Sequence, residues 1–351
     1  MSELSKARIP DAPAIQRLPL LQLILVGLQH VLLMYGGAIA VPLIIGQAAG
    51  LSREEIAFLI NADLLVAGIA TIVQSLGIGP MGIRMPVMMG ASFAAVGSMV
   101  AMAGMPGIGL QGIFGATIAA GFFGMLIAPF MSKVVRFFPP LVTGTVITSI
   151  GLSLFPVALN WAGGGSAASE FGALQYLAIA ALVLLTILLI NRFMRGFWVN
   201  ISVLIGMGLG YIIAGSIGMV DLSGLGEAPW VQVVTPLHFG MPVFELAAIV
   251  SMLIVVMVIL VETSADILAV GDIIDTKVDS KRLGNGLRAD MIASVVAPLF
   301  GSFTQSAFAQ NVGLVAVTGV KSRYVVATGG LILVTLGLLP IMGRVFAAVP
   351  T

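Results

Sequence analysis

The sequence predicts an all-α membrane protein, and three observations support this prediction. Of the 351 residues, 59% are hydrophobic and only 9% are charged, whereas an ordinary soluble domain is about a quarter charged. Apolar runs long enough to cross a hydrocarbon core of about 30 Å follow one another almost from end to end. The 43 glycines and 17 prolines would weaken soluble helices, but membrane bundles use them for close helix contacts and functional breaks.

The same composition excludes several kinds of protein chemistry. The chain has no cysteine and two histidines, which excludes disulfides and thiolate metal sites, and we expect neither a metal nor a cofactor. It has no His-Glu-x-x-His or Gly-x-Ser-x-Gly element, so we do not expect an enzyme. A phosphate-binding Gly-Lys-Ser/Thr loop is also absent, so an ion gradient would have to supply any energy. A net charge of +1 argues neither for nor against nucleic acid, and no nucleic-acid partner is expected.

Apolar runs between charges and turn residues give eleven candidate spans in the lipid bilayer. They lie near residues 20–46, 54–78, 85–104, 109–131, 140–160, 174–192, 198–219, 243–270, 287–303, 304–320 and 322–343. A polar segment, residues 1–19, precedes them. This segment lacks the order of basic, apolar and small-residue regions that marks a signal peptide, so we expect it to remain as a tail.

The distribution of basic residues predicts how the chain is oriented, because lysine and arginine collect on the cytoplasmic side. They occupy the N-terminal tail and alternate connections, with Arg53 and Arg344 as exceptions. The residues that share one side are Lys6, Arg8, Arg17, Arg84, Lys133, Arg136, Arg192, Arg195, those from Lys277 to Arg288, Lys321 and Arg323. This pattern predicts a multi-pass protein of the inner (cytoplasmic) membrane with a cytoplasmic N-terminus.

The third and tenth segments are not ordinary helices. Both are short, rich in small residues and interrupted, and Phe93-Ala-Ala-Val-Gly97 is similar to Phe308-Ala-Gln-Asn-Val-Gly313 with one residue inserted. Paired interrupted segments in two halves of a transporter are the best sequence pointer to its central site, where half-helix N-termini meet the substrate. The odd spacing of seven segments would make the two halves inverted. The alternative is a chance match between short strings of small residues.

Two carboxyl groups lie at membrane depth in the eighth segment. An ionisable group in hydrocarbon costs at least about 2.5 kcal/mol, so it needs a partner, a cavity or a neutral state. Glu262 follows the apolar run 249–261, and Asp266 lies one helical turn later on the same face. Two carboxyl groups so placed disfavour each other's ionisation, which suits a group that carries a proton. A solvated helix end is the alternative, and it fits Asp272 and Asp275 better than Glu262.

Other polar residues in the apolar segments have two interpretations each. Asp290 lies at the predicted start of the ninth segment, so a helix N-cap or an ion pair is an alternative to a coupling role. His30 lies ten residues into the first apolar run and is either a packing residue or a titrating group. Asp63 indicates a hydrogen bond that ties helices together. Gln310 and Asn311 offer adjacent carboxamides, whose donors and acceptors suit the edge of a heterocycle.

The tenth segment and its flank, Phe308-Ala-Gln-Asn-Val-Gly-Leu-Val-Ala-Val-Thr-Gly-Val-Lys-Ser-Arg-Tyr324, resemble the signature of the nucleobase/ascorbate transporters, also called the nucleobase:cation symporter-2 family. The pattern Gln-Asn-x-Gly-x-x-x-x-Thr is met at Gln310, Asn311, Gly313 and Thr318. Further stretches similar to this family are Gln29–Pro42, Phe138–Leu152, Asn160–Gly164 and Val261–Val270. The resemblance runs from about Leu21 to the end of the chain and is strongest to bacterial uric acid/xanthine permeases.

This resemblance implies an inverted-repeat transporter fold of seven plus seven spans, in which two broken spans carry short strands. It assigns residues 20–131 and 241–343 to a core domain, and residues 132–220 to the first half of a gate domain. With about eleven spans present, the last three spans of the family, which complete the gate, would be absent. The chain would then be a fragment or a variant. Family members move the core against the gate, commonly as homodimers, and bacterial members are proton symporters.

The function that the resemblance implies is proton-coupled uptake of an oxidised purine, xanthine or uric acid. Glutamine at position 310 is typical of the purine branch, whereas the uracil branch has glutamate there. Gly319 stands where several urate carriers have arginine, which favours xanthine. The alternatives are a uracil or other nucleobase permease, a channel-like or sulfate-type anion protein, and a truncated form that does not transport.

The resemblance also implies which residues hold the substrate. Glu262 and Gln310 would bind the purine edge, Phe93 would stack on the ring, and the backbones of Phe93 and Ala309 would add hydrogen bonds. The residue types agree with this, because a carboxylate accepts from ring N–H groups and an aromatic face buries a planar surface. The residues expected to support affinity or proton coupling are His30, Asp266, Asp290, Asn311 and Thr318.

Overall fold

The computed structural model describes residues 14–135, 140–165, 170–220 and 229–348. These residues form a mostly helical fold, as predicted, with two short strands. The first elements are α1 (Leu20–Ala48), α2 (Arg53–Leu76), β1 (Met89–Ala91), η1 (Phe93–Ala95), α3 (Val96–Ala103), α4 (Gly109–Ile127), η2 (Ala128–Phe130) and α5 (Met131–Val134). The middle elements are α6 (Pro140–Ser153), α7 (Phe155–Ala162), α8 (Leu174–Phe193), α9 (Phe197–Asn200) and α10 (Ser202–Ser216). The last elements are α11 (Leu246–Ile273), α12 (Ser280–Val296), η5 (Ala297–Phe300), β2 (Gln305–Ala307), α13 (Ala309–Thr318), α14 (Arg323–Gly337) and α15 (Pro340–Ala347).

Several of these helices can cross a membrane. In the described part of the chain, α1, α2, α4 with its continuation through α5, α8 and α11 are long and apolar enough, which makes five. A sixth would be the pair α14 and α15, whose axes are bent by 77°. The molecule is therefore a multi-pass membrane protein, while the predicted count of eleven spans stays a prediction.

The start of α12 differs from its prediction. The ninth segment was expected from residue 287, but α12 begins at Ser280 because Asp279 caps it, its side chain accepting a hydrogen bond of 2.7 Å from the backbone N–H of Arg282. Asp290 consequently lies well inside the helix and is fully buried. The interpretation of Asp290 as the N-cap was wrong, since the polar residues before it form helix rather than loop.

The two broken segments meet at the centre of the fold, and both carry a strand as predicted. Strands β1 and β2 pair antiparallel with Met89 opposite Ala307 and Ala91 opposite Gln305. Each strand is held by a hydroxyl group from the helix that precedes it. Thr71 of α2 accepts from the N–H of Met89 at 2.9 Å, and Ser294 of α12 accepts from the N–H of Gln305 at 2.9 Å. The buried N–H groups of Met89 and Gln305 are thus satisfied by protein hydroxyl groups.

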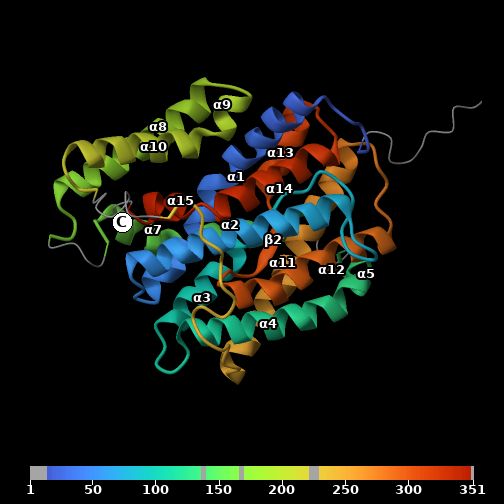
Figure 1. Ribbon diagram of the computed structural model, residues 1–351, viewed down its shortest axis with the longest axis horizontal. Helices are drawn as coiled ribbons and strands as arrows, with labels where there is room; N and C mark the ends of the chain where they lie inside the picture. Colours follow the sequence, from blue (N-terminus) through green and yellow to red (C-terminus); the bar gives the residue numbers. More distant parts are fainter. Residues whose placement is uncertain (1–13, 136–139, 166–169, 221–228, 349–351) are drawn as a thin grey trace, which may run out of the picture.

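The long helices lie around this crossing (Figure 1), with α1, α2 and α14 packed on one another and α4 packed against α11 and α12. A Cβ atom on Gly68 of α2 would lie 2.5 Å from the carbonyl oxygen of Gly330 of α14, so glycine is required for this close helix contact. Helices α8, α9 and α10 lie together along one side of the bundle, next to α1.

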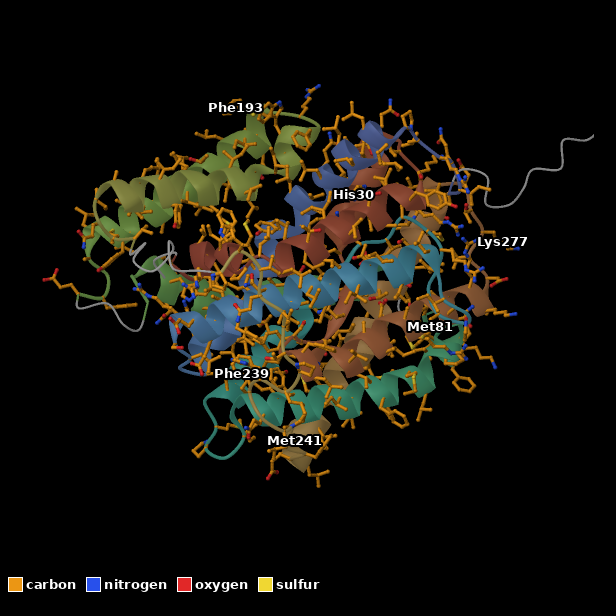
Figure 2. All side chains as sticks on the ribbon, viewed as in Figure 1. His30, Met81, Phe193, Phe239, Met241 and Lys277 are labelled. Carbon is orange, nitrogen blue, oxygen red and sulfur yellow. The ribbon has the colours of Figure 1, made fainter. Side chains whose placement is uncertain are left out.

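The end of the predicted tail contacts the start of α14. The backbone carbonyl of Ala14 accepts from the N–H of Arg323 at 2.9 Å, and that of Gln16 accepts from the Ser322 hydroxyl at 2.6 Å. Next to this contact, Lys321 forms an ion pair of 2.8 Å with Asp275. Figure 2 places Met81 and Lys277 at one end of the molecule. The basic residues Lys6, Arg8 and Arg136 and the start of the motif at Phe138 lie outside the described residues.

Candidate functional site

Two phenylalanine rings meet where the broken segments cross. Phe93 begins η1 after strand β1, and Phe308 directly follows strand β2. Their ring centroids are 6.4 Å apart with an interplanar angle of 56°, which is within the range of favourable aromatic pairs. Phe308 is buried and Phe93 is half-buried. Phe93 is therefore the more accessible of the two to a ligand.

Two glycines allow the Phe308 ring to lie against the backbone. A Cβ atom on Gly90 of β1 would lie 2.5 Å from Cε2 of Phe308, and one on Gly37 of α1 would lie 2.9 Å from its Cε1. Any side chain at either position would push the ring away. The ring is thus held between a strand and a helix that come from the same half of the fold.

A cavity of about 420 Å³ opens next to these rings. On one side it is bounded by α1, Phe93, Phe308 and Gln310, and on the other by α7, α10 and α15. The second group contributes Trp161, Val203, Leu204, Met207 and Phe346. Its volume and its mostly apolar lining with few polar groups are typical of sites for small molecules.

Gln310 is the one lining residue whose side chain carries both a hydrogen-bond donor and an acceptor. It lies in the first turn of α13 and is exposed. Helix α13 begins at Ala309, and the first N–H groups of a helix have no partner within it. The N–H of Asn311 donates to the carbonyl of Phe308 at 3.0 Å, which leaves those of Ala309 and Gln310 for a ligand. The partial positive charge at this helix end favours an electron-rich ligand atom. A carboxamide, two N–H groups and an aromatic face are therefore available to one planar polar ligand.

Glu262 does not line this cavity. It is half-buried on α11, and its Oε2 atom is buried without a hydrogen-bond partner among the described residues. Its neighbour Thr263 accepts from the N–H of Ala307 at 3.4 Å, which fixes this part of α11 against β2. Asp266, one turn later, also has a buried oxygen without a partner. The structure brings Phe93 and Gln310 together around the cavity, and the assignments of Glu262, Asp266 and Ala309 stay predictions.

His30 and Asn311 form a buried pair between α1 and α13. The Nδ2 of Asn311 donates to the backbone carbonyl of His30 at 2.9 Å and lies 3.1 Å from the His30 Nδ1. Both residues are almost completely buried. This pair fixes the helix turn that presents Gln310, so both residues lie where they can support a ligand without touching it.

Asp290 has a partner that the sequence analysis missed. The Nε2 of Gln74 on α2 donates to Oδ1 of Asp290 at 2.7 Å and to the carbonyl of Gly286 at 3.2 Å, while its Oε1 accepts from the N–H of Ile83 at 3.0 Å. The signal was present, because a lone carboxamide in an apolar helix usually bonds to a neighbouring helix.

Two other polar residues have structural partners. Asp63 accepts at Oδ1 from the Ser302 hydroxyl at 2.5 Å and from Nε2 of Gln305 at 3.1 Å, which confirms the predicted tie between segments. Thr318 donates to the carbonyl of Leu314 at 2.8 Å at the end of α13 and is not a lining residue of the cavity. Within the described residues, no cluster of three or more His, Asp or Glu side chains could hold a metal ion.

Comparison with known proteins gives consistent matches over almost the whole chain. The model of a family described as the permease family matches residues 21–351. The uric acid transporter UacT of Escherichia coli is 48% identical over 330 residues, which are 94% of this chain and 68% of that protein. The xanthine permease of Bacillus subtilis is 41% identical, with 93% of this chain and 74% of that protein covered. The transmembrane domain of the cyanobacterial bicarbonate transporter BicA has a similar fold, with a TM-score of 0.65 at 18% identity, covering 95% of this chain and 88% of that domain.

Proposed function

This chain belongs to the permease family whose model matches residues 21–351, and from this premise we propose that it carries an oxidised purine, uric acid or xanthine, across the cytoplasmic membrane. The observation that carries the proposal is the cavity of about 420 Å³ in which Gln310 and the half-buried Phe93 face one space. Relatives named as a uric acid transporter and a xanthine permease, at 48% and 41% identity, support the same substrate class.

The chemistry of an oxidised purine fits the lining of this cavity. Its planar ring offers two apolar faces, and its edge alternates N–H donors and carbonyl acceptors. Phe93 can bury one face, and the Gln310 carboxamide can both give and accept on the edge. The N–H groups of Ala309 and Gln310, at the start of α13, can donate to a ring carbonyl. The more similar of the two quoted relatives is a uric acid transporter, so Gly319 does not decide in favour of xanthine and both purines are proposed.

Glu262 is proposed to complete the site by accepting from ring N–H groups. Its buried Oε2 without a partner supports this role, because a buried carboxylate oxygen gains when a donor arrives. Glu262 lies outside the cavity lining, but α11 packs against η1 and α13, which carry Phe93 and Gln310, so a ligand that reaches between these elements would meet all three side chains. These elements belong to the proposed core, residues 20–131 and 241–343, and an elevator-like movement of this core against a gate that begins with residues 132–220 is proposed to carry the bound solute.

Proton coupling is proposed to use the carboxyl groups of Glu262, Asp266 and Asp290. Asp266 follows Glu262 by one turn of α11, and α11 packs against α12, which carries Asp290. Glu262 and Asp266 each have a buried oxygen without a hydrogen-bond partner among the described residues. Groups so arranged can exchange a proton while the net charge of the site stays low. A symporter of this kind, with an inverted repeat of seven plus seven spans, a cytoplasmic N-terminus and a homodimeric assembly, is our complete proposal.

Uptake of labelled uric acid and labelled xanthine by cells that express the chain tests this function. We expect saturable accumulation of at least one purine, inhibition by the other, and loss of accumulation with a protonophore. Accumulation that resists the protonophore would contradict the coupling. Stronger inhibition by uracil than by either purine would instead identify a pyrimidine permease.

A further inference from the structure

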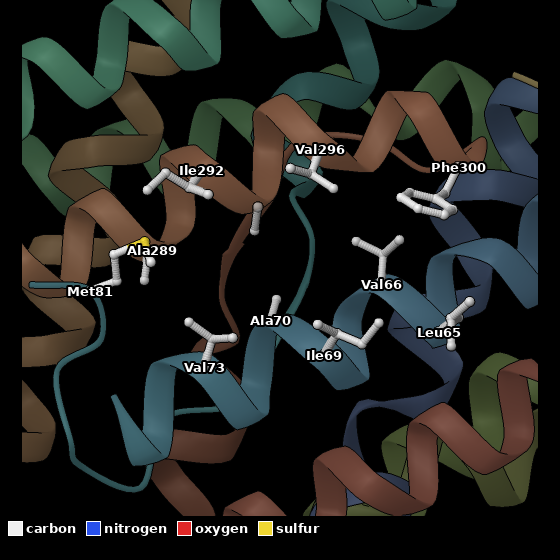
Figure 3. A pocket seen from close by; sticks show the side chains of 11 residues that line it. Leu65, Val66, Ile69, Ala70, Val73, Met81, Ala289, Ile292, Val296 and Phe300 are labelled. Atoms are coloured by element: carbon white, nitrogen blue, oxygen red, sulfur yellow. The ribbon is translucent and has the colours of Figure 1, made fainter. Parts of the chain in front are cut away.

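A second, fully apolar cavity lies between α2 and α12, away from the proposed purine site. Its volume is about 150 Å³, and all eleven residues that line it are apolar. Figure 3 shows their side chains facing one another across the gap between the two helices, from Met81 and Ala289 at one end to Leu65 and Phe300 at the other. Apolar cavities of this size stay dry and bind small hydrocarbons.

The cavity is open at the surface of the helix bundle. Ile69 of α2 is 50% exposed and Val296 of α12 is 39% exposed, and both belong to its lining. Ala70 and Ala293 provide small side chains at positions where larger ones would fill the gap. A membrane helix with such a gap on its outer face meets lipid hydrocarbon, since water is absent at this depth.

One end of the cavity is marked by positive charge. Ala289, Ile292, Ala293 and Val296 follow the spacing of one helical face on α12, and Arg288 continues this face one turn before Ile292. Arg288 donates to Oδ1 of Asn285 at 3.3 Å and has no ion pair within the described residues. Arg84 packs on the backbone at Gly77, directly after α2, and is exposed. Met81 and Ala289 form the same end of the groove (Figure 3), and Arg84 and Arg288 stand three residues and one residue from them in the sequence. This end of the groove therefore suits the anionic head group of a hydrocarbon chain.

We propose that this groove binds one acyl chain of an anionic phospholipid, with the phosphate held by Arg288 and Arg84. Basic pockets between membrane helices on the side rich in lysine and arginine bind such head groups. The acyl chain then lies between α2 and α12. These are the two helices whose Thr71 and Ser294 hold strands β1 and β2. This site is separate from the purine cavity and does not depend on which solute the protein carries.

Photo-crosslinking in nanodiscs tests the proposal with the full chain. The probe is phosphatidylglycerol with a diazirine in the middle of one acyl chain, and a phosphatidylcholine with the same chains is the comparison. We expect adducts to concentrate on residues 65–73 and 289–296 relative to the exposed helix α8. Excess unlabelled phosphatidylglycerol should suppress them in the wild type, a measurement that requires no variant. Labelling of the groove that does not exceed the labelling of α8 would overturn the proposal. This is the result expected if a second copy of the protein or another protein segment covers the groove.

Two variants distinguish the contribution of the acyl chain from that of the lipid head group. Ala293→Phe fills the groove and should remove most of the adducts, whereas Ala178→Phe on the exposed face of α8 should not. Arg288→Gln should lower the preference for phosphatidylglycerol over phosphatidylcholine about fivefold, because one basic residue near the surface contributes about that much. Arg195→Gln is the charge-matched control. Equal labelling by both lipids, unchanged in Arg288→Gln, would overturn the anionic head group.

Discussion

The Nε2 of Gln74 lies 2.7 Å from Oδ1 of Asp290, and this hydrogen bond joins α2 to α12 in the buried interior. The same carboxamide accepts from the N–H of Ile83, which leads the chain toward β1. One side chain therefore holds a buried acid and the entry to a strand in place. Its partner is 216 residues away in sequence, so the contact also ties the two halves of the fold together.

Replacing Gln74 by Ala should destabilise the protein by about 1–3 kcal/mol, because it leaves an oxygen of Asp290 and the Ile83 N–H buried without partners. The measurement is the melting temperature in detergent, which should fall by several degrees. Gln111→Ala is the control, since its hydrogen bond to Phe239 is exposed and should contribute much less. An equal effect of the two substitutions would contradict the role of the buried contact.

Gly90→Ala should displace the Phe308 ring, because the new Cβ would lie 2.5 Å from Cε2. Overpacking of this kind costs about 1–3 kcal/mol, and the shifted ring should also narrow the purine cavity. Thermal stability and purine affinity should fall together. Gly144→Ala is the matched control, since no atom lies within 4 Å of its Cβ position. Unchanged purine affinity in a well-folded Gly90→Ala protein would show that the position of the Phe308 ring does not affect purine binding.

The two phenylalanines should respond differently to truncation. Phe308→Ala removes a buried ring and should cost about 3–5 kcal/mol of stability. Phe93→Ala removes a half-buried ring that bounds the cavity and should weaken purine binding up to about tenfold, the value of one aromatic contact. Phe93→Tyr keeps the stacking face and should bind nearly as the wild type does. Loss of thermal stability without loss of purine affinity in Phe93→Ala would show that the Phe93 ring packs within the protein and does not stack on the ligand.

Glu262→Gln should remove the charge-assisted hydrogen bonds to the purine edge and weaken binding about ten- to hundredfold. The same variant should reduce the dependence of uptake on the proton gradient, because a carboxamide carries no titratable proton and only Asp266 and Asp290 remain. Binding is measured with labelled purine, and coupling is measured by uptake at several external pH values. A purine affinity equal to that of the wild type would show that Glu262 does not bind the substrate.

Much of the fold follows from local patterns in the sequence. Hydropathy located the long helices α1, α2, α4, α8 and α11, and small residues located the two interrupted segments, because both signals depend on neighbouring residues. The start of α12 was missed because its first two turns are polar and its cap, Asp279, resembles a loop residue. Of the two carboxamides predicted to face a heterocycle, Gln310 lines a cavity and Asn311 bonds to His30, and the pairing with a heterocycle stays a prediction.

The remaining parts of the site depend on contacts between distant segments. Trp161 and Phe346 complete the cavity opposite Gln310, and a single sequence contains no signal that joins them. The same holds for Gln74 with Asp290 and for Thr71 and Ser294 with the two strands. Intramembrane polar residues could be recognised as paired, but their partners could be identified only from the structure.

Equilibrium binding of labelled uric acid and xanthine to the purified chain, with and without Gln310→Ala, tests the central claim most directly. The account predicts saturable binding of at least one purine, displaced by the other purine but not by uracil. Gln310→Ala should weaken this binding about tenfold or more, because a purine edge loses its partner, while the exposed control Gln175→Ala should not. Absence of saturable purine binding, or equal affinity in wild type and Gln310→Ala, would contradict the account.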